Sequence, residues 1–262
     1  MDNMDNVKQT IMDKLYETKT HYEVKIPLAI ESGSRGWGFA ATNADYDCRF
    51  VYLHKPDWYL SVFKKKDFIE YATDGIFDIK GYDITRALTD ITNSRATIYE
   101  YLCSNEVYIQ DGYAVDRLRN LAKIFFNPIP VSYHYLGLAR NTLSEIIDTD
   151  EAKVKKYFYV LRPIANLNFI WQYRKMPYME YDKTLLETNP GQEIFSAIQE
   201  LKELKITLRE HDKIPQNKFL ITYFKAEIER FNDCLKGMKH TKSSDYDLVD
   251  ETFRDIIKAA WK

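Results

Sequence analysis

The segment from Ile30 to Tyr52, IESGSRGWGFAATNADYDCRFVY, constrains the fold more than any other part of the chain. It reads as the end of an apolar strand, a turn at Gly33 and Ser34, a polar loop, and a second strand carrying Asp45 and Asp47. Successive side chains of a strand point to opposite faces, so the two carboxylates are predicted to share one face. Neighbouring carboxylates repel each other at neutral pH, and a divalent cation removes that repulsion. The pair therefore predicts a site for a hard ion, Mg²⁺ or Mn²⁺.

The glycines before this pair supply the other half of such a site. Gly33 and Ser34, followed by Gly36 and Gly38, let the backbone turn tightly and come close to a ligand. Backbone N–H groups and a serine hydroxyl in such a turn suit phosphate oxygens. Arg35 is placed to help bind a phosphate, or to pair with a carboxylate of the site. A DxD pair or a Gly-Ser turn alone is a weak signal, whereas their order and spacing together are a strong one.

An apolar strand, a Gly-Ser turn, the loop 35–44 and a DxD strand, in this order, resemble the signature of the DNA polymerase β-like nucleotidyltransferase superfamily. The strings ESGSRGWGF, NADYDCRFVY, FDIKGYDITRAL and KKYFYVLRPI further resemble the RlaP-like group of predicted bacterial and phage nucleotidyltransferases. The match is close over residues 28–110 and looser over residues 130–180. It implies a catalytic half built on a small mixed β-sheet with helices on one face. With the helical bundle that periodicity predicts after it, the expected fold class is α+β. The resemblance also implies that Gly-Ser begins a helix and that a later strand adds a third carboxylate.

The candidate for this third carboxylate is Asp78. It stands between Phe77 and Ile79, an apolar–Asp–apolar pattern within a predicted strand. Asp83 is the alternative, although an aspartate directly before a helical pattern is typical of an N-cap. The predicted catalytic and metal-binding set is thus Asp45, Asp47 and Asp78.

A proline-rich break at 127–130, Asn-Pro-Ile-Pro, is the best domain boundary in the chain. We predict a catalytic domain at residues 1–127 and a helical domain at residues 131–262. After the break, apolar residues recur at helical spacing over 131–147 and 152–175, and again in the last third of the chain. This pattern is typical of a helical bundle.

Basic residues in the second half offer a further wall for a nucleotide. Lys155, Tyr159 and Arg162 lie four and three residues apart, hence on one side of a helix. The resemblance implies that this segment, KKYFYVLRP, contacts the phosphates and base of a nucleotide. The alternative is a solvated face with its tyrosines packed inward, and either way we expect Lys156 and Arg162 to be exposed. Lys64–Lys66 is a second basic cluster, either a solvated loop or an attractor of phosphate. The predicted nucleotide-binding residues are Gly33, Ser34, Arg35, Lys156 and Arg162.

Composition narrows the class of protein. The net charge of −2 and the pI of about 6.2 argue weakly against a broad nucleic-acid surface, although a local basic patch would suffice. Three scattered cysteines without a CxxC pattern suggest reduced thiols in a cytoplasm. No apolar run approaches the length of a membrane span, so we expect no membrane partner.

The sequence thus predicts an enzyme that transfers a nucleoside monophosphate from an NTP, with ATP the expected nucleotide, to an acceptor hydroxyl and releases pyrophosphate. An RNA end, a protein or a small molecule remains open as the acceptor. The alternative is a catalytically degenerate module that binds a nucleotide or a partner without chemistry.

Overall fold

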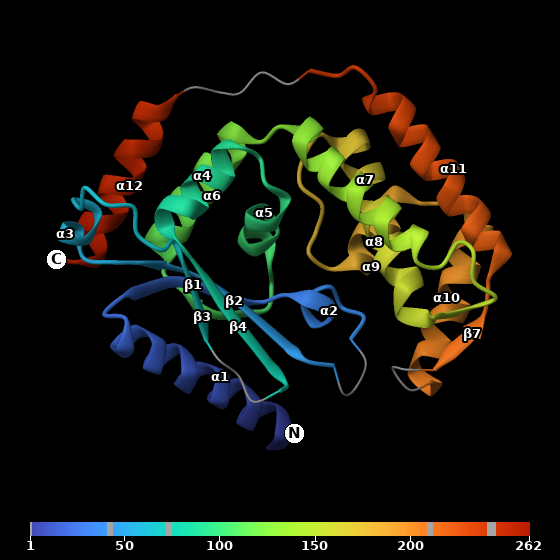
Figure 1. Cartoon of the computed structure of the whole chain (residues 1–262), viewed down its shortest axis with the longest axis horizontal. Coiled ribbons are helices and arrows are strands. Elements are labelled where there is room, and N and C mark those ends of the chain that lie inside the picture. Colours follow the sequence, from blue (N-terminus) through green and yellow to red (C-terminus); the bar gives the residue numbers. More distant parts are fainter. Residues whose placement is uncertain (1, 41–43, 72–74, 209–211, 240–244) are drawn as a thin grey trace. The chain divides into compact units, whose positions relative to one another are not determined.

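The computed structural model describes residues 2–40, 44–71, 75–208, 212–239 and 245–262 (Figure 1). They group into two compact units. The first unit combines Met1–Phe126 with Lys242–Lys262, and the second is Asn127–Thr241. Among the described helices, none is long and apolar enough to cross a membrane.

A five-stranded mixed sheet organises the first unit, with the strand order β3-β4-β2-β1-β5. Its strands are β1 (Lys25–Glu31), β2 (Tyr46–Leu53), β3 (Phe68–Tyr71), β4 (Phe77–Asp83) and β5 (Val107–Gln110). Only β2 and β4 pair in parallel, and the other neighbours are antiparallel. Three residues of the predicted loop between β1 and β2, 41–43, lie outside the described part of the chain.

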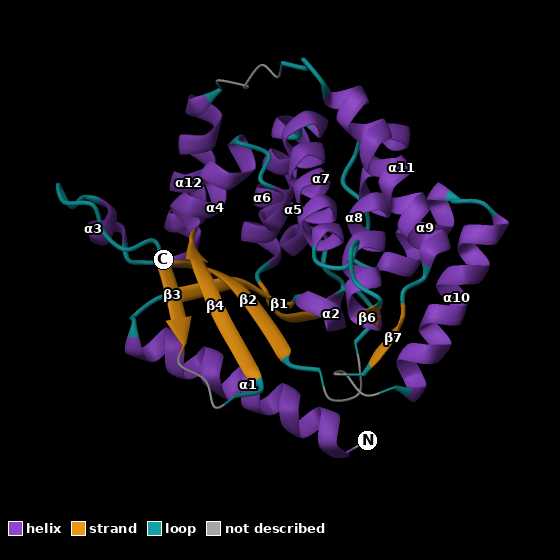
Figure 2. Ribbon diagram, turned by 45° about the vertical axis from the view of Figure 1, so that its right-hand side comes forward, coloured by secondary structure: helices purple, strands orange, loops and turns teal. Residues whose placement is uncertain are grey.

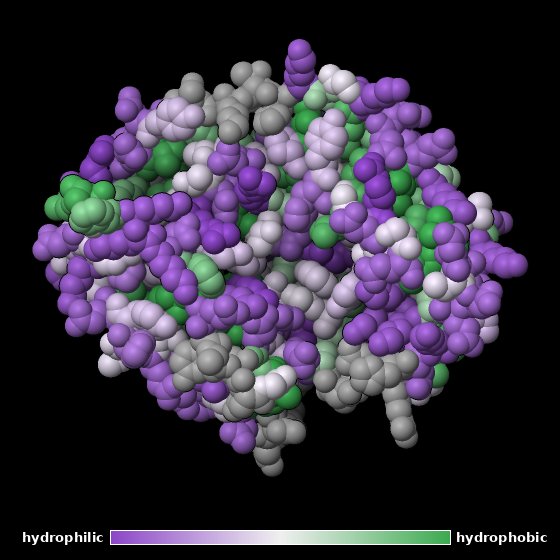
Figure 3. Space-filling model, viewed as in Figure 1, coloured by the Kyte–Doolittle hydropathy of each residue, from purple (hydrophilic) through white to green (hydrophobic). Residues whose placement is uncertain are grey.

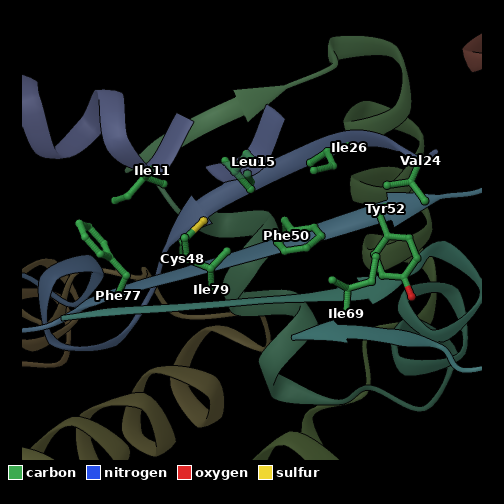
Figure 4. Packing of buried hydrophobic residues seen from close by; sticks show 11 residues of the cluster. Ile11, Leu15, Val24, Ile26, Cys48, Phe50, Tyr52, Ile69, Phe77 and Ile79 are labelled. Atoms are coloured by element: carbon green, nitrogen blue, oxygen red, sulfur yellow. The ribbon is translucent and has the colours of Figure 1, made fainter. Parts of the chain in front are cut away.

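Helix α1 (Asp2–His21) covers one face of this sheet (Figure 2). Its apolar residues Ile11 and Leu15 are fully buried. They pack with strand residues of every second position, because those side chains share a face. This core cluster, shown in Figure 4, includes Ile26, Cys48, Phe50, Tyr52, Ile69, Phe77 and Ile79.

The opposite face is covered by helices α4 (Ile84–Thr92) and α6 (Gly112–Phe125), with α5 (Ala96–Cys103) beside them. Helix α4 buries Ile84, Ala87, Leu88 and Ile91, which recur at helical spacing. The mixed sheet with a following helical unit confirms the predicted fold class. One detail was wrong, since helices pack on both faces of the sheet rather than on one. The reason is that the amphipathic helix at the start of the chain returns onto the strands.

The last helix, α12 (Tyr246–Ala260), packs with the first unit. It contacts α4 and α6, and Arg117 of α6 donates a hydrogen bond to Asp255 at 2.8 Å. The sequence placed residues 246–260 in the helical domain, and this packing differs from that expectation. The first unit covers one face of α12, on which Thr252, Ile256 and Ile257 are buried.

Two one-turn helices complete the first unit, α2 (Gly33–Gly36) and α3 (Pro56–Tyr59). The second unit is helical, as predicted. It contains α7 (Pro128–Ser144), α8 (Val154–Tyr173), α9 (Tyr181–Thr188), α10 (Gln192–Thr207) and α11 (Lys218–Leu235). A two-stranded antiparallel ladder of β6 (Glu151–Lys153) and β7 (Lys213–Pro215) ties two of its loops together. The proline break starts α7 at Pro128, with Asn127 as the N-cap.

Candidate active site

Asp47 and Asp78 lie side by side in the sheet. Asp47 is on β2 and Asp78 on β4, and the parallel pairing of these strands places the two residues in direct register. Their side chains retain exposed fractions of 29% and 39%. Two carboxylates from separate parts of the sequence thus meet at one partly open point of the sheet.

The Gly33 turn contacts this carboxylate pair. Gly33 has a φ of +58°, in the left-handed region, and a Cβ atom there would stand 2.0 Å from Asp47 Oδ2. The N–H of Ser32 donates to the carbonyl of Asp47 at 2.8 Å, which ties the turn to the start of β2. Ser34 follows in the short helix α2. Only glycine fits at this position without displacing the Asp47 side chain. The conformation of the turn and the position of Asp47 therefore depend on each other.

Arg35 anchors the loop before β2 rather than a carboxylate. Its guanidinium donates to the carbonyls of Ala44 and Asp45, at 2.6 Å and 3.1 Å, and lies 3.9 Å from the ring centroid of Tyr46. Pairing with a site carboxylate, one of the two roles considered from the sequence, is not what this geometry shows.

Asp45 directly precedes β2 and is exposed. Its charge reaches Asp47, whose pKa it helps to raise. Within the described part of the chain, however, no three His, Cys, Asp or Glu side chains are grouped so that they could hold a metal ion. The side chains of Asp45, Asp47 and Asp78 are therefore not close enough together in this structure to coordinate one ion jointly.

Arg49 bridges the carboxylate pair, and the sequence reasoning missed it. Its Nη2 donates to Asp47 Oδ1 at 3.1 Å and to Asp78 Oδ2 at 2.7 Å. Its Nη1 donates to the carbonyls of Asp78 and Cys48, at 2.6 Å and 3.1 Å. Because side chains alternate along a strand, Arg49 shares the face of Asp47, and the DxDxR spacing was the available signal.

Lys80 neutralises the other oxygen of Asp78. Its Nζ lies 3.1 Å from Asp78 Oδ1 and 3.2 Å from Glu70 Oε1 on β3. Burial alone would raise the pKa of Asp78, but the hydrogen bonds from Lys80 and Arg49 outweigh it and hold this pKa below its ordinary value. Asp78 is thus a firmly ionised carboxylate.

A buried carboxylate, Glu31, supports Asp47 from behind, and the sequence reasoning missed it as well. Glu31 is 4% exposed, and its Oε1 accepts the backbone N–H of Asp47 at 2.9 Å. The Tyr108 hydroxyl donates to Glu31 Oε2. Burial, above all, raises the pKa of Glu31. Burial also raises the pKa of Asp47, and the neighbouring carboxylates of Asp78 and Asp45 add to that shift while Arg49 opposes it.

Residues 7–255 match the family described as RlaP, the RNA repair pathway DNA polymerase beta family. The chain belongs to this family. It is also 32% identical to the uncharacterized protein YcgL of Bacillus subtilis (strain 168), over 98% of both chains. A nucleotidyltransferase-like protein from Exiguobacterium sibiricum 255-15 of solved structure shares 9% identity and a TM-score of 0.32, covering 98% of this chain and 81% of that one.

In this RlaP family member, Asp83 is a structural residue. It is fully buried and caps α4, where its Oδ1 accepts the N–H of Thr85 at 2.9 Å. Its Oδ2 accepts the Tyr59 hydroxyl at 3.0 Å. Asp83 lies at the far end of β4 from Asp78, so the structure supports the N-cap role rather than the alternative of a third site carboxylate.

The second unit contains the two remaining predicted residues of this RlaP chain. Lys156 forms an ion pair with Glu145. Arg162 is only 4% exposed, and its guanidinium lies 5.9 Å from the ring centroid of Tyr135 on α7. The expectation that Arg162 is exposed was wrong, because this side of α8 packs within the bundle. Nucleotide contact by Lys156 and Arg162 stays a prediction.

Proposed function

We propose that the chain is a metal-dependent nucleotidyltransferase that moves a nucleoside monophosphate from an NTP, expected to be ATP, to the hydroxyl of an RNA end and releases pyrophosphate. The observation that carries this proposal is the register pair of Asp47 and Asp78 beside the Gly33 turn. The description of the family as part of an RNA repair pathway favours RNA over a protein or a small molecule as the acceptor.

The donor set fits a hard divalent cation in its chemistry. Asp45, Asp47 and Asp78 offer only carboxylate oxygens, which Mg²⁺ and Mn²⁺ prefer. The raised pKa of Asp47 reflects burial and negative neighbours, an environment that a cation relieves. When bound, such an ion lowers the pKa of an attacking hydroxyl and neutralises charge on the triphosphate. For Asp78 to bind the ion, either the hydrogen bond from Arg49 to Asp78 Oδ2 or the ion pair of Lys80 with Asp78 Oδ1 must break.

The other residues of the site have separate tasks. The backbone at Gly33 and Ser34 can approach phosphate oxygens closely because no side chain intervenes at Gly33. Arg49, held by two carbonyls, bridges the two carboxylates and would place positive charge near the transferred phosphate. Glu31 fixes the backbone of Asp47.

A second candidate function is a module that binds a nucleotide without chemistry. The observation that favours it is that Arg49 and Lys80 already occupy both oxygens of Asp78. Such a module would bind NTP whether or not a divalent ion is present, and it would release no pyrophosphate.

One experiment separates the two. Each α-³²P-labelled NTP is incubated with Mg²⁺ or Mn²⁺ and RNA oligonucleotides that end in a 3′-hydroxyl or a 3′-phosphate, with NTP binding measured in parallel by calorimetry. We expect label on the hydroxyl-ended RNA, and a loss of at least about 100-fold in Asp47→Asn with NTP binding largely kept. Binding of NTP by the wild type without label on any RNA, protein or small-molecule acceptor would favour the second candidate.

A further inference from the structure

The segment Leu60–Lys66, LSVFKKK, which joins α3 to β3, exposes large apolar side chains next to a run of cations. Leu60, Val62 and Phe63 are 79%, 91% and 80% exposed. Lys64, Lys65 and Lys66 are exposed as well. In Figure 3 a hydrophobic patch stands out at the left-hand edge, beside α3. Exposed apolar groups that adjoin charge mark an interaction surface rather than an ordinary loop.

Aromatic rings alternate with these cations. The Nζ of Lys65 lies 4.9 Å from the ring centroid of Trp58, and the Nζ of Lys66 lies 4.4 Å from that of Phe68. Trp58 in turn stacks on His54, with ring centroids 4.0 Å apart and planes within 11°. Ammonium groups and flat π-faces thus recur along one stretch of surface. Single-stranded nucleic acid presents the complementary series of phosphates and bases.

We propose that the segment Leu60–Lys66 binds single-stranded RNA, with phosphates on the three lysines and a base stacked on Phe63. This inference rests on the proposed function, with RNA as the acceptor. Charge complementarity requires a polyanionic partner. An anionic membrane surface is the other polyanion to consider. Membrane-surface elements usually present a long amphipathic helix, whereas α3 is a single turn and its neighbour is a loop.

The segment belongs to the same compact unit as the carboxylate pair. It follows the C-terminal end of β2, and Asp47 stands near the N-terminal end, about 20 Å away along a strand that rises roughly 3.3 Å per residue. Between them on the face of Asp78 lie two further cations. Lys80 is 38% exposed, and the Arg86 guanidinium lies 4.0 Å from the ring centroid of Tyr82.

Acidic residues occur along this route, and two of them are paired. Glu70 lies 3.2 Å from Lys80, and Asp67 lies 3.7 Å from Arg86. The lysines of the segment are therefore the most accessible positive charges of the route. An RNA whose end reaches the carboxylates would place its upstream nucleotides on the segment.

The test measures RNA binding without nucleotide, by fluorescence anisotropy of a fluorescein-labelled 12-nucleotide RNA and the full chain between 50 and 200 mM KCl. A triple variant, Lys64→Ser with Lys65→Ser and Lys66→Ser, should lower the slope of log affinity against log salt by about 2, since each single-strand phosphate contact contributes roughly 0.7. Phe63→Ser should weaken binding about tenfold and leave the slope unchanged, because stacking involves no counterion release.

Two controls match these variants in chemistry. Lys225→Ser with Lys236→Ser and Lys239→Ser removes the same charge from exposed positions of the second unit, and Ile206→Ser removes an exposed apolar side chain of 85% exposure. Both controls should bind like the wild type. The inference is overturned if the segment variants bind RNA like the controls, if the wild type binds no RNA, or if only phosphatidylserine vesicles bind the segment.

A transfer assay separates this inference from the proposed function. The segment variants should label a trinucleotide acceptor at the wild-type rate, because it is too short to reach the segment, and label the 12-nucleotide RNA more slowly. Equal rates on both acceptors would reject the segment as an RNA contact while nucleotidyl transfer stands. Loss of transfer in Asp47→Asn with RNA binding intact supports both.

Discussion

Arg49 shows how single residues decide the state of this site. It is 17% exposed and donates to two carboxylates and two carbonyls, so it acts as a fixed internal cation. Asp47 would otherwise carry its charge in a partly buried position beside Asp78. A divalent cation and Arg49 stabilise the same pair of carboxylates, and their contributions are therefore coupled.

This coupling predicts the behaviour of Arg49→Met. Without metal, the variant should lose about 2 kcal/mol of unfolding free energy, because two carboxylates are left close together without their bridge. Mn²⁺ should restore a larger part of the stability in the variant than in the wild type. Thermal unfolding with EDTA and with Mn²⁺ measures both effects. Lys80→Met is the matched control, and its more exposed pairs should contribute less than about 1 kcal/mol. Equal responses of the two variants to Mn²⁺ would contradict the assigned role of Arg49.

His54 gives a pH dependence at the same scale. Burial, helped by the charge of Lys65, lowers its pKa from 6.5 to about 4. Between pH 6.5 and pH 4, His54 is therefore protonated in the unfolded chain but not in the folded chain. The free energy of unfolding falls as the pH drops through this window. His54→Phe keeps a ring on Trp58 but cannot be protonated. Urea unfolding at pH 6.5 and pH 4 should show a smaller loss in this variant, by about 1 kcal/mol or less since His54 is partly exposed. His21→Phe is the control, and a loss in His54→Phe equal to that of the wild type would reject the prediction.

Sequence spacing was sufficient to place the Gly33 turn directly before the strand of Asp47, because strand alternation and the glycine turn are local rules. Asp78 was added by the family resemblance, since its meeting with Asp47 depends on the pairing of β2 with β4. The DxDxR spacing places Arg49 on the face of Asp47, but the roles of Arg49 and Glu31 were not predicted, for a physical reason. Their roles depend on the pairing of β2 with β4 and on the hydroxyl of Tyr108, contacts between residues far apart in the sequence. Arg162 was misplaced because a charged residue on a helix is usually solvated, and only the packing of α7 on α8 makes it an exception.

At the scale of elements, the turn into α2 couples β1 to β2. Periodicity predicted the helix after Asp83, which is α4, and the long helices of the second unit well, since each has a continuous apolar stripe. It missed the ladder of β6 and β7, whose three-residue strands are too short to show alternation. The Gly33 turn is the element on which the candidate site depends most directly.

Gly33→Ala should therefore damage both stability and transfer. The positive φ alone costs about 1 kcal/mol for a residue with a side chain, and the added Cβ meets Asp47 Oδ2 at 2.0 Å. Label transfer should fall at least about 100-fold as Asp47 is displaced. Gly38→Ala is the matched control, with a φ of +83° and nothing within 4 Å of its Cβ. It should show the backbone penalty without the loss of transfer, and similar activities of the two variants would refute the contact.

At the scale of the molecule, the chain forms two units whose boundary is crossed twice. The proline break at 127–130 predicted where the chain passes from the first unit to the second. The return of α12 to the first unit was not predictable, because the sequence of an amphipathic helix does not specify which apolar surface it packs against. The boundary of residues 1–127 as a functional domain stays a prediction, and the packing adds residues 246–260 to its fold.

Fragments test this assignment. Residues 1–126 alone should be less stable than residues 1–126 joined by a Gly-Ser linker to residues 245–262, since only the second fragment covers the α12 contacts of α4 and α6. Far-UV circular dichroism with thermal unfolding measures the difference. A scrambled α12 sequence on the same linker is the control. Equal midpoints for all three fragments would show that α12 is not part of this core.

The pairing of Arg117 with Asp255 also has a consequence for synthesis. These residues are separated by 138 positions, and the whole second unit is made between them. Domains generally form as they leave the ribosome, beginning with the N-terminal one. Here the unit that begins first is completed only after the second unit has been made. Until α12 leaves the ribosome, the surfaces of α4 and α6 that it covers stay exposed on the nascent first unit.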